Sequence, residues 1–189
     1  ILPPKLAPIQ IVIIPIYHTE EEKSTVLSAM EAVKQELQDF RVHLDTRDEV
    51  TPGFKYNDWE MRGVPLRIEI GPKDIAKNQV TIARRDLPGK AGKSFVSRDG
   101  LNFHIHEILD AIQVSLYERA LAFRKANTSE PENYREFCEQ IQNTWAFCWW
   151  CGNSECEAKI KDETKATARC IPLEQPGGQG SCIVCGAVS

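Results

Sequence analysis

The chain has 189 residues, which is enough for one large domain or two small ones. Hydrophobic residues make up 42% and charged residues 26%, a composition that excludes disorder over most of the length. The net charge of −4 excludes a protein that coats nucleic acid by bulk attraction. The longest apolar run, residues 9–17, is too short to span a membrane, and no pattern points to secretion.

Predicted strands and helices alternate over the first 70 residues. Residues 9–16 are a nearly continuous run of apolar, mostly β-branched side chains, which predicts a buried strand. A Thr-Glu-Glu-Glu capping box opens a helix over 19–39, in which apolar residues recur on one face. A short strand over 41–45, a helix over 54–62 and a strand over 64–70 with one charged face follow.

Two more strands and a long amphipathic helix complete the first domain. They cover residues 79–85, 93–96 and 102–125. Helices between strands are typical of right-handed crossovers that join parallel strands. The order of elements therefore predicts an α/β fold, with a mixed, mainly parallel five-stranded sheet and flanking helices.

All cysteines lie in the last third of the chain. A polar connector over 126–131 precedes most of this region, so we place an α/β domain at 1–125 and a second domain at 126–189. The second domain begins with a predicted helix over 132–142. The seven cysteines are Cys138, Cys148, Cys151, Cys156, Cys170, Cys182 and Cys185. Their clustering favours a metal site over disulfides.

Two close cysteine pairs are the strongest chemical signal. Cys151 and Cys156 form one pair, and Cys182 and Cys185 form the other, so that two turns offer four thiolates to one zinc ion. Cys148-Trp-Trp-Cys151 is an alternative first pair, and spacing leaves open a zinc ribbon that uses Cys148 instead of Cys156. Either set fills all four ligand positions, which favours structural over catalytic zinc.

A basic stretch interrupts the acidic chain. Residues 61–100 contain nine Lys and Arg against four Asp and Glu. Such a segment can mark the face of a domain that meets phosphate. A solvated loop with a chance excess of charge is the alternative.

Signatures of catalysis are missing from the sequence. It contains no Gly-rich phosphate loop and no G-x-S-x-G motif. The turn after the first predicted strand, Tyr17-His-Thr-Glu20, lacks glycine and carries an acid where a phosphate would need donors. We therefore expect no catalytic residue in this chain.

Several segments carry more specific motifs. The first domain contains Leu2-Pro-Pro-Lys-Leu-Ala-Pro8, the segment from Gly53-Phe-Lys-Tyr to Ile-Gly-Pro-Lys-Asp74, and Val80-Thr-Ile-Ala-Arg-Arg85. These segments resemble the anticodon-binding domain of class II prolyl-tRNA synthetases. The tail, with Cys151-Gly-Asn-Ser-Glu-Cys156 and Cys182-Ile-Val-Cys-Gly186, is similar to the zinc domain of the eukaryote- and archaea-like branch of that family. The resemblance covers essentially the whole chain and implies a small α+β zinc-binding domain after the anticodon-binding fold.

The resemblance also implies site residues. The family's zinc ligands fall on Cys151, Cys156, Cys182 and Cys185, which leaves Cys148 spare. The family's guanine-reading positions fall on Tyr56, Glu60, Arg67, Lys73 and Asp74, and Arg84 and Arg85 are candidate contacts of the RNA backbone.

The chemistry of these residue types agrees with that assignment. An aromatic ring can stack on an unpaired base, and a carboxylate can accept from the N1–H and N2–H edge of guanine. Arg or Lys can donate to guanine O6 and N7 or to phosphate. A surface charge or a half-buried aromatic remains the alternative for each residue taken singly.

The resemblance implies a larger parent enzyme. In that family, a cytoplasmic proline–tRNA ligase uses ATP and proline in a catalytic domain, which we expect to precede Ile1. We expect the parent to act on tRNA(Pro), to dimerise mainly through that domain and to continue to a C-terminal tyrosine. This fragment should therefore bind RNA and be inactive as a ligase. A stand-alone RNA-binding or protein-interaction module of the same fold is the alternative.

Overall fold

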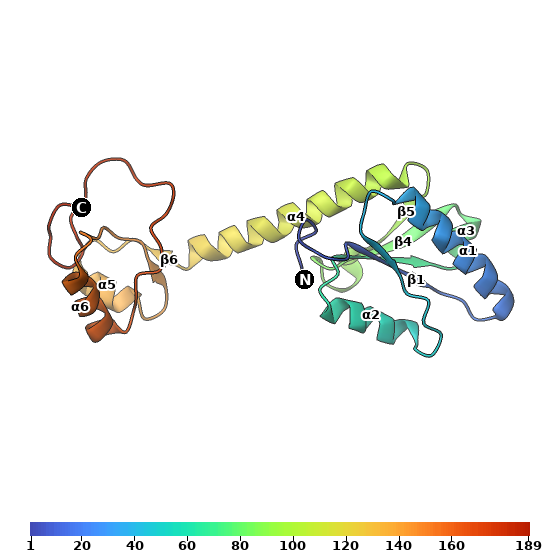
Figure 1. The fold of residues 1–189 in the computed structure, drawn as a ribbon, viewed down its shortest axis with the longest axis horizontal. Coiled ribbons are helices and arrows are strands. Elements are labelled where there is room, and N and C mark those ends of the chain that lie inside the picture. Colours follow the sequence, from blue (N-terminus) through green and yellow to red (C-terminus); the bar gives the residue numbers. More distant parts are fainter. The chain divides into compact units, whose positions relative to one another are not determined.

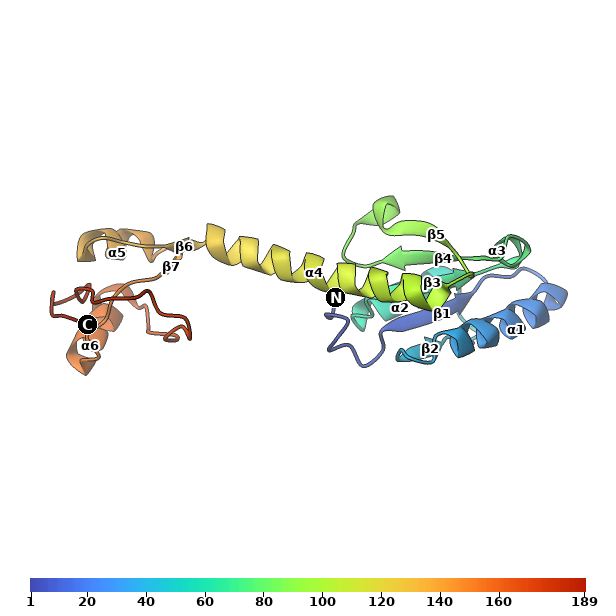
Figure 2. The same cartoon turned by 90° about the horizontal axis from the view of Figure 1, so that it is seen from above.

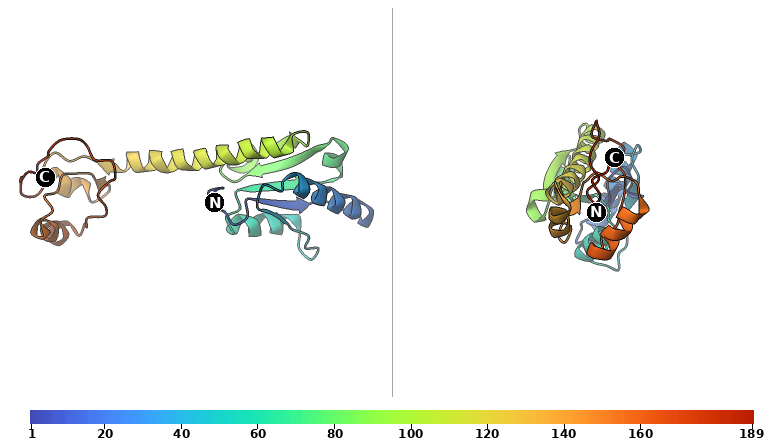
Figure 3. Two further views of the ribbon diagram at one scale, coloured as in Figure 1. Left: turned by 45° about the horizontal axis from the view of Figure 1, so that its top comes forward. Right: turned by 90° about the vertical axis from the view of Figure 1, so that its left-hand side faces the viewer.

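The computed structural model describes residues 1–189, and the chain divides into two compact units, 1–119 and 120–189. Helix α4, Leu101–Ala126, runs unbroken through this division (Figure 3). The domain boundary placed at residue 125 stays a prediction. None of the helices combines the length and the hydropathy that crossing a membrane requires.

The first unit is built on a five-stranded sheet with the order β2-β1-β3-β4-β5 (Figure 2). The strands are β1 Ile11–Pro15, β2 Val42–Leu44, β3 Leu66–Ile70, β4 Gln79–Arg84 and β5 Lys93–Ser97. Strand β1 pairs in parallel with β2 and β3, whereas β4 runs antiparallel to both β3 and β5. The predicted α/β fold with a mixed five-stranded sheet is confirmed.

Helices cover both faces of this sheet (Figure 1). They are α1 Glu20–Glu36, α2 Pro52–Met61, α3 Pro72–Ala76 and α4, and a short 3-10 helix covers Gly89–Gly92. Helices α1 and α4 pack on one face with Ile11 and Ile13, while Trp59 of α2 packs on the other with Val12 and Ile14. Strand β1 is therefore buried on both faces, which explains its continuous apolar sequence.

The second unit contains two helices and a two-stranded parallel sheet. Helix α5 covers Tyr134–Gln140, α6 covers Ser154–Thr164, and β6 Thr128–Ser129 pairs with β7 Trp145–Ala146. Helix α6 was not predicted from the sequence. The buried hydrophobic side chains of this unit are Phe137, Cys156 and Cys182, so two of the three are cysteines.

Candidate nucleic-acid interface and metal centre

Strand β3 separates its side chains between the two faces of the sheet. Leu66, Ile68 and Ile70 belong to the core under α1 and α4. Arg67 and Glu69 point to the opposite face, the side of α2, because neighbours alternate along a strand. The charged face predicted for this strand is thereby placed beside Tyr56 and Glu60 of α2.

Five charged side chains form a continuous chain of ion pairs on this face. Glu60 lies 3.5 Å from Arg85 and 3.1 Å from Arg67. Arg67 lies 3.1 Å from Glu69, whose other carboxylate oxygen is 2.7 Å from Nζ of Lys93. We call Arg85, Glu60, Arg67, Glu69 and Lys93 the ion-pair chain.

Tyr56 lies under the middle of the ion-pair chain. The guanidinium carbon of Arg67 is 3.9 Å from the centre of the Tyr56 ring, within the range of a cation–π contact. Burial, and then the negative charge of Glu69, raise the pKa of the Tyr56 phenol above its ordinary value, against a smaller opposing effect of Arg67. The phenol is therefore neutral at physiological pH.

Lys73 and Asp74 follow β3, at the start of α3. Lys73 is exposed and forms no hydrogen bond or ion pair. The Asp74 carboxylate accepts from the backbone N–H of Gly71 at 3.0 Å, from Thr81 at 3.0 Å and from Gln79 at 3.3 Å. The hydrogen bonds of Asp74 thus stabilise the turn from β3 into α3, whereas the Lys73 side chain has no such contact.

Arg84 and Arg85, at the end of β4, point to opposite sides of the sheet. The Arg84 guanidinium donates to Asp86 at 3.0 and 2.7 Å and lines a shallow hollow with His104 and Ile108 of α4. Arg85 instead joins the ion-pair chain through Glu60. The structure therefore brings Arg85 together with Tyr56, Glu60 and Arg67, whereas Arg84 belongs to the α4 side.

A buried carboxylate anchors α2, and sequence reasoning missed it. The Asp45 side chain is 1% exposed and accepts from Nε1 of Trp59 at 2.7 Å. Arg47 donates to Asp45 at 2.9 and 2.7 Å and to Asp58 of α2 at 2.9 Å. Burial opposes ionisation of Asp45, but the hydrogen bonds from Arg47 and Trp59 outweigh it and hold the pKa of this carboxyl well below its usual range.

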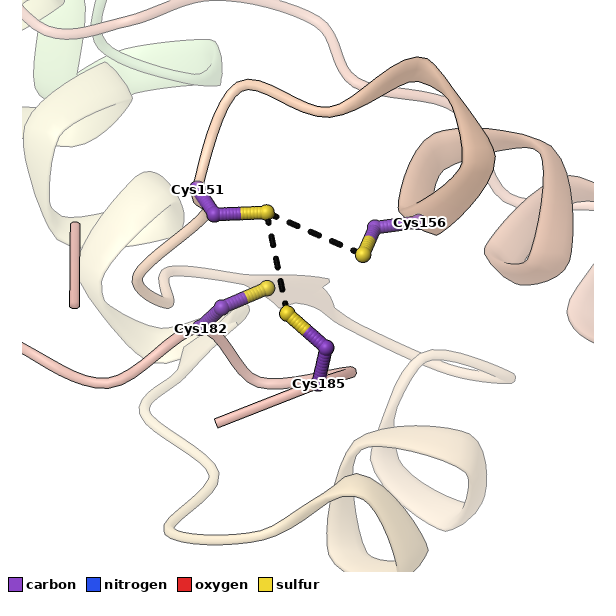
Figure 4. A group of neighbouring side chains, drawn as sticks. All are labelled: Cys151, Cys156, Cys182 and Cys185. Atoms are coloured by element: carbon purple, nitrogen blue, oxygen red, sulfur yellow. Dashed lines mark hydrogen bonds between the residues drawn. The ribbon is translucent and has the colours of Figure 1, made fainter. Parts of the chain in front are cut away.

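The second unit gathers four thiols at one point (Figure 4). The Sγ atoms of Cys151, Cys156, Cys182 and Cys185 all lie within 4.8 Å of one another. Cys151 Sγ is 3.7 Å from Cys156 Sγ and 3.8 Å from Cys185 Sγ. Sulfur atoms at about 2.3 Å from a tetrahedral zinc are separated by about 3.8 Å, so this donor set fits such an ion. Cys148 is outside the group.

Tight turns and a helix end bring the four thiols together. Cys151 and Cys185 are each followed by a glycine with positive φ, +79° at Gly152 and +73° at Gly186, a conformation that other residues rarely adopt. Cys156 comes from the first turn of α6, which Asn153 caps by accepting from the backbone N–H of Glu155.

The thiols differ in their tendency to ionise. Burial opposes ionisation of Cys182, yet backbone amides, led by that of Cys185, lower its pKa to about 6. Burial and the neighbouring thiols raise the pKa of Cys156 to about 12. Four thiolates at this distance repel one another, so all four can ionise together only around a cation.

Comparison with known proteins agrees with both parts of the structure. Residues 10–113, more than half of the chain, match the family described as "Anticodon binding domain", and residues 134–189 match "Prolyl-tRNA synthetase, C-terminal". The sheet and the four-thiol unit thus correspond to an anticodon-binding domain followed by a C-terminal domain of the prolyl-tRNA synthetase type, whose four thiols are positioned to hold a metal ion.

Comparison with individual proteins identifies the kind of synthetase. The chain is 50% identical to the proline–tRNA ligase of Chloroflexus aurantiacus and 49% identical to that of Roseiflexus castenholzii, over 98% of the chain and 39% of each relative. It is 48% identical to "Proline--tRNA ligase, chloroplastic/mitochondrial" of Arabidopsis thaliana, over 98% of the chain and 35% of that protein. The chain belongs to the prolyl-tRNA synthetase family, as the C-terminal part of such an enzyme. It spans about two fifths of the length of these relatives.

Proposed function

We propose that this chain reads the anticodon of tRNA(Pro) for a cytoplasmic proline–tRNA ligase. In this proposal the catalytic domain of the parent binds ATP and proline and provides most of a homodimer interface. The observation that carries the proposal is the grouping of Tyr56, Glu60 and Arg67 on the α2 side of the sheet, within a domain whose family binds anticodons.

The geometry suggests how a guanine would be recognised. Tyr56 offers a neutral ring that carries Arg67 on its face, and unpaired bases stack on such aromatic and guanidinium planes. Glu60 is one-third exposed and presents a carboxylate to accept from guanine N1–H and N2–H, while Arg67 donates to O6 or N7. Lys73 and Asp74 at the start of α3 extend the proposed base contacts, and Arg85 extends them toward phosphate.

For the second unit, we propose one structural zinc ion held by Cys151, Cys156, Cys182 and Cys185. The support is the agreement between the sulfur separations of 3.7 and 3.8 Å and the tetrahedral radius of a zinc–thiolate site. Four thiolates leave no position for water or substrate, so the ion would stabilise the fold and take no part in catalysis.

The test of anticodon reading is binding of a proline tRNA anticodon stem-loop to the 189-residue chain, compared with a stem-loop whose guanines are replaced. We expect tighter binding of the guanine form, and equal binding would contradict base reading. Glu60→Lys reverses the carboxylate that faces the base and should abolish most of the preference.

Arg85→Ala is the matched comparison, because Arg85 pairs with the same Glu60 from the edge of the surface. It should weaken binding of both stem-loops about equally, since a phosphate contact carries no base preference. If Arg85→Ala removed the preference and Glu60→Lys kept it, the assigned roles would be reversed.

A further inference from the structure

We propose that Glu69 is a positioning residue for anticodon reading, an inference that rests on the proposed function. Glu69 lies on β3, two residues after Arg67, and its side chain is 7% exposed. Buried carboxylates are rare unless they are paired with cations. Glu69 is paired through both of its carboxylate oxygens.

Both oxygens of the Glu69 carboxylate are occupied by cations from two strands. Oε1 accepts from Nε of Arg67 at 3.1 Å, and Nη2 of the same guanidinium is also 3.1 Å away. Oε2 accepts from Nζ of Lys93, on β5, at 2.7 Å. One buried carboxylate thus fixes two of the three cations in the ion-pair chain.

Arg67 is held differently on its two edges. The edge formed by Nε and Nη2 faces Glu69, which is 7% exposed, while Nη1 donates to Glu60, which is 33% exposed. An incoming base can replace the exposed Glu60 contact and leave the buried Glu69 contact in place. Arg67 would then keep its position over Tyr56 throughout binding, because a rigid guanidinium fork held along one edge keeps its plane.

The difference between the buried Glu69 contact and the exposed Glu60 contact of Arg67 gives Glu69 a positioning role. It does not reach the base itself in this arrangement, and it acts through Arg67. A guanidinium that is free to rotate loses the planar geometry that distinguishes guanine O6 and N7 from other base edges. Loss of Glu69 should therefore reduce discrimination between bases more than it reduces total affinity.

The experiment measures a discrimination ratio, the Kd for a guanine-replaced proline stem-loop divided by the Kd for the guanine form. We expect Glu69→Gln in the 189-residue chain to lower this ratio by about tenfold, the order of one well-oriented base contact. Asp86→Asn is the matched control. Asp86 is likewise buried and paired with an arginine, Arg84, but it lies away from Tyr56, so the ratio should stay unchanged.

Thermal unfolding of both variants separates positioning from stability. If Glu69→Gln keeps the wild-type ratio, Glu69 is structural and the inference is wrong, while the proposed function stands. If the wild-type chain itself shows no preference for guanine, the proposed function and the inference fail together.

Glu69→Asp decides the case in which the glutamine variant does not fold. It keeps the negative charge and withdraws the carboxylate from Arg67 by one methylene group. A positioning role predicts a lower ratio in a folded protein, and an unchanged ratio would overturn it.

Discussion

The metal site yields the sharpest prediction, because two cysteines compete for one place in it. Cys148→Ser and Cys156→Ser each replace one sulfur by oxygen in the same unit. Cys156 belongs to the group of four thiols in the structure and Cys148 does not. We therefore expect Cys148→Ser to keep one zinc per chain and Cys156→Ser to lose it.

The size of the effect follows from how little else the second unit buries. Its buried hydrophobic side chains are Phe137, Cys156 and Cys182, so a single large apolar side chain remains once the cysteines are assigned to the metal. Complete burial of one such side chain contributes about 1.5–3 kcal/mol. A structural zinc site contributes about 10–16 kcal/mol at neutral pH. The proposed zinc ion would therefore dominate the stability of this unit.

The assay combines metal content with local unfolding. Zinc is measured by atomic absorption after dialysis, and hydrogen exchange follows the backbone of each unit. Removal of zinc, or Cys156→Ser, should expose residues from about 145 onward. The first unit should stay protected, since its core of Ile11, Ile13, Leu66, Ile68 and their neighbours contains no metal ligand.

Two results would refute this reasoning. If Cys156→Ser retained the metal and Cys148→Ser lost it, the ribbon that spacing alone allows would be correct. If both units stayed equally protected after chelation of the metal, the fold of the second unit would not depend on it, and its stability would have to come from other contacts.

Two further predictions concern stability. Asp45→Asn should cost about 1.5–3 kcal/mol, because it removes the charge from the buried acceptor of the Arg47 hydrogen bonds and weakens the contact with Trp59. Since the folded-state pKa of Asp45 is depressed, its contribution is present above its unfolded pKa of about 3.9 and is lost as pH falls further, so the variant should show a flatter unfolding free energy in acid. Gly180→Ala should lower the melting temperature of the second unit, because a Cβ there would lie 2.1 Å from the Trp149 ring, whereas Gly177→Ala, with nothing within 4 Å, should not.

Local patterns in the sequence were sufficient for most of the first unit. The apolar run of β1 predicted a strand buried on both faces, and Thr19 accepts from the backbone N–H of Glu22 at the start of α1, as the capping pattern indicated. These features depend on neighbours within a few residues of each other. The parallel pairing of β1 with β2 and β3 agrees with the predicted mixed sheet, because helices α1 and α2 connect these three strands.

Features that depend on distant residues could not be predicted in the same way. Asp45 contacts Trp59 because the loop after β2 packs against α2, and nothing in either segment specifies that partner. Arg84 is the last residue of β4 and Arg85 follows it, and their side chains point to different sides of the sheet. Helix α6 was not predicted although Asn153 is a good cap, because Cys156 is its one buried residue and no apolar stripe marks the helix in the sequence.

The ion-pair chain also reconciles the net negative charge of the protein with the binding of negatively charged RNA. Its three cations and two anions alternate, so without RNA the surface neutralises most of its own charge. Bulk attraction for phosphate is correspondingly small, and a nonspecific polyanion gains little by displacing an internal pair. A guanine edge can replace Glu60 at Arg67, and Arg67 at Glu60, with donors and acceptors in the matching order. In the proposed function, an internally paired surface of this kind would favour the base that satisfies both partners, with lower affinity for RNA in general and higher discrimination between bases.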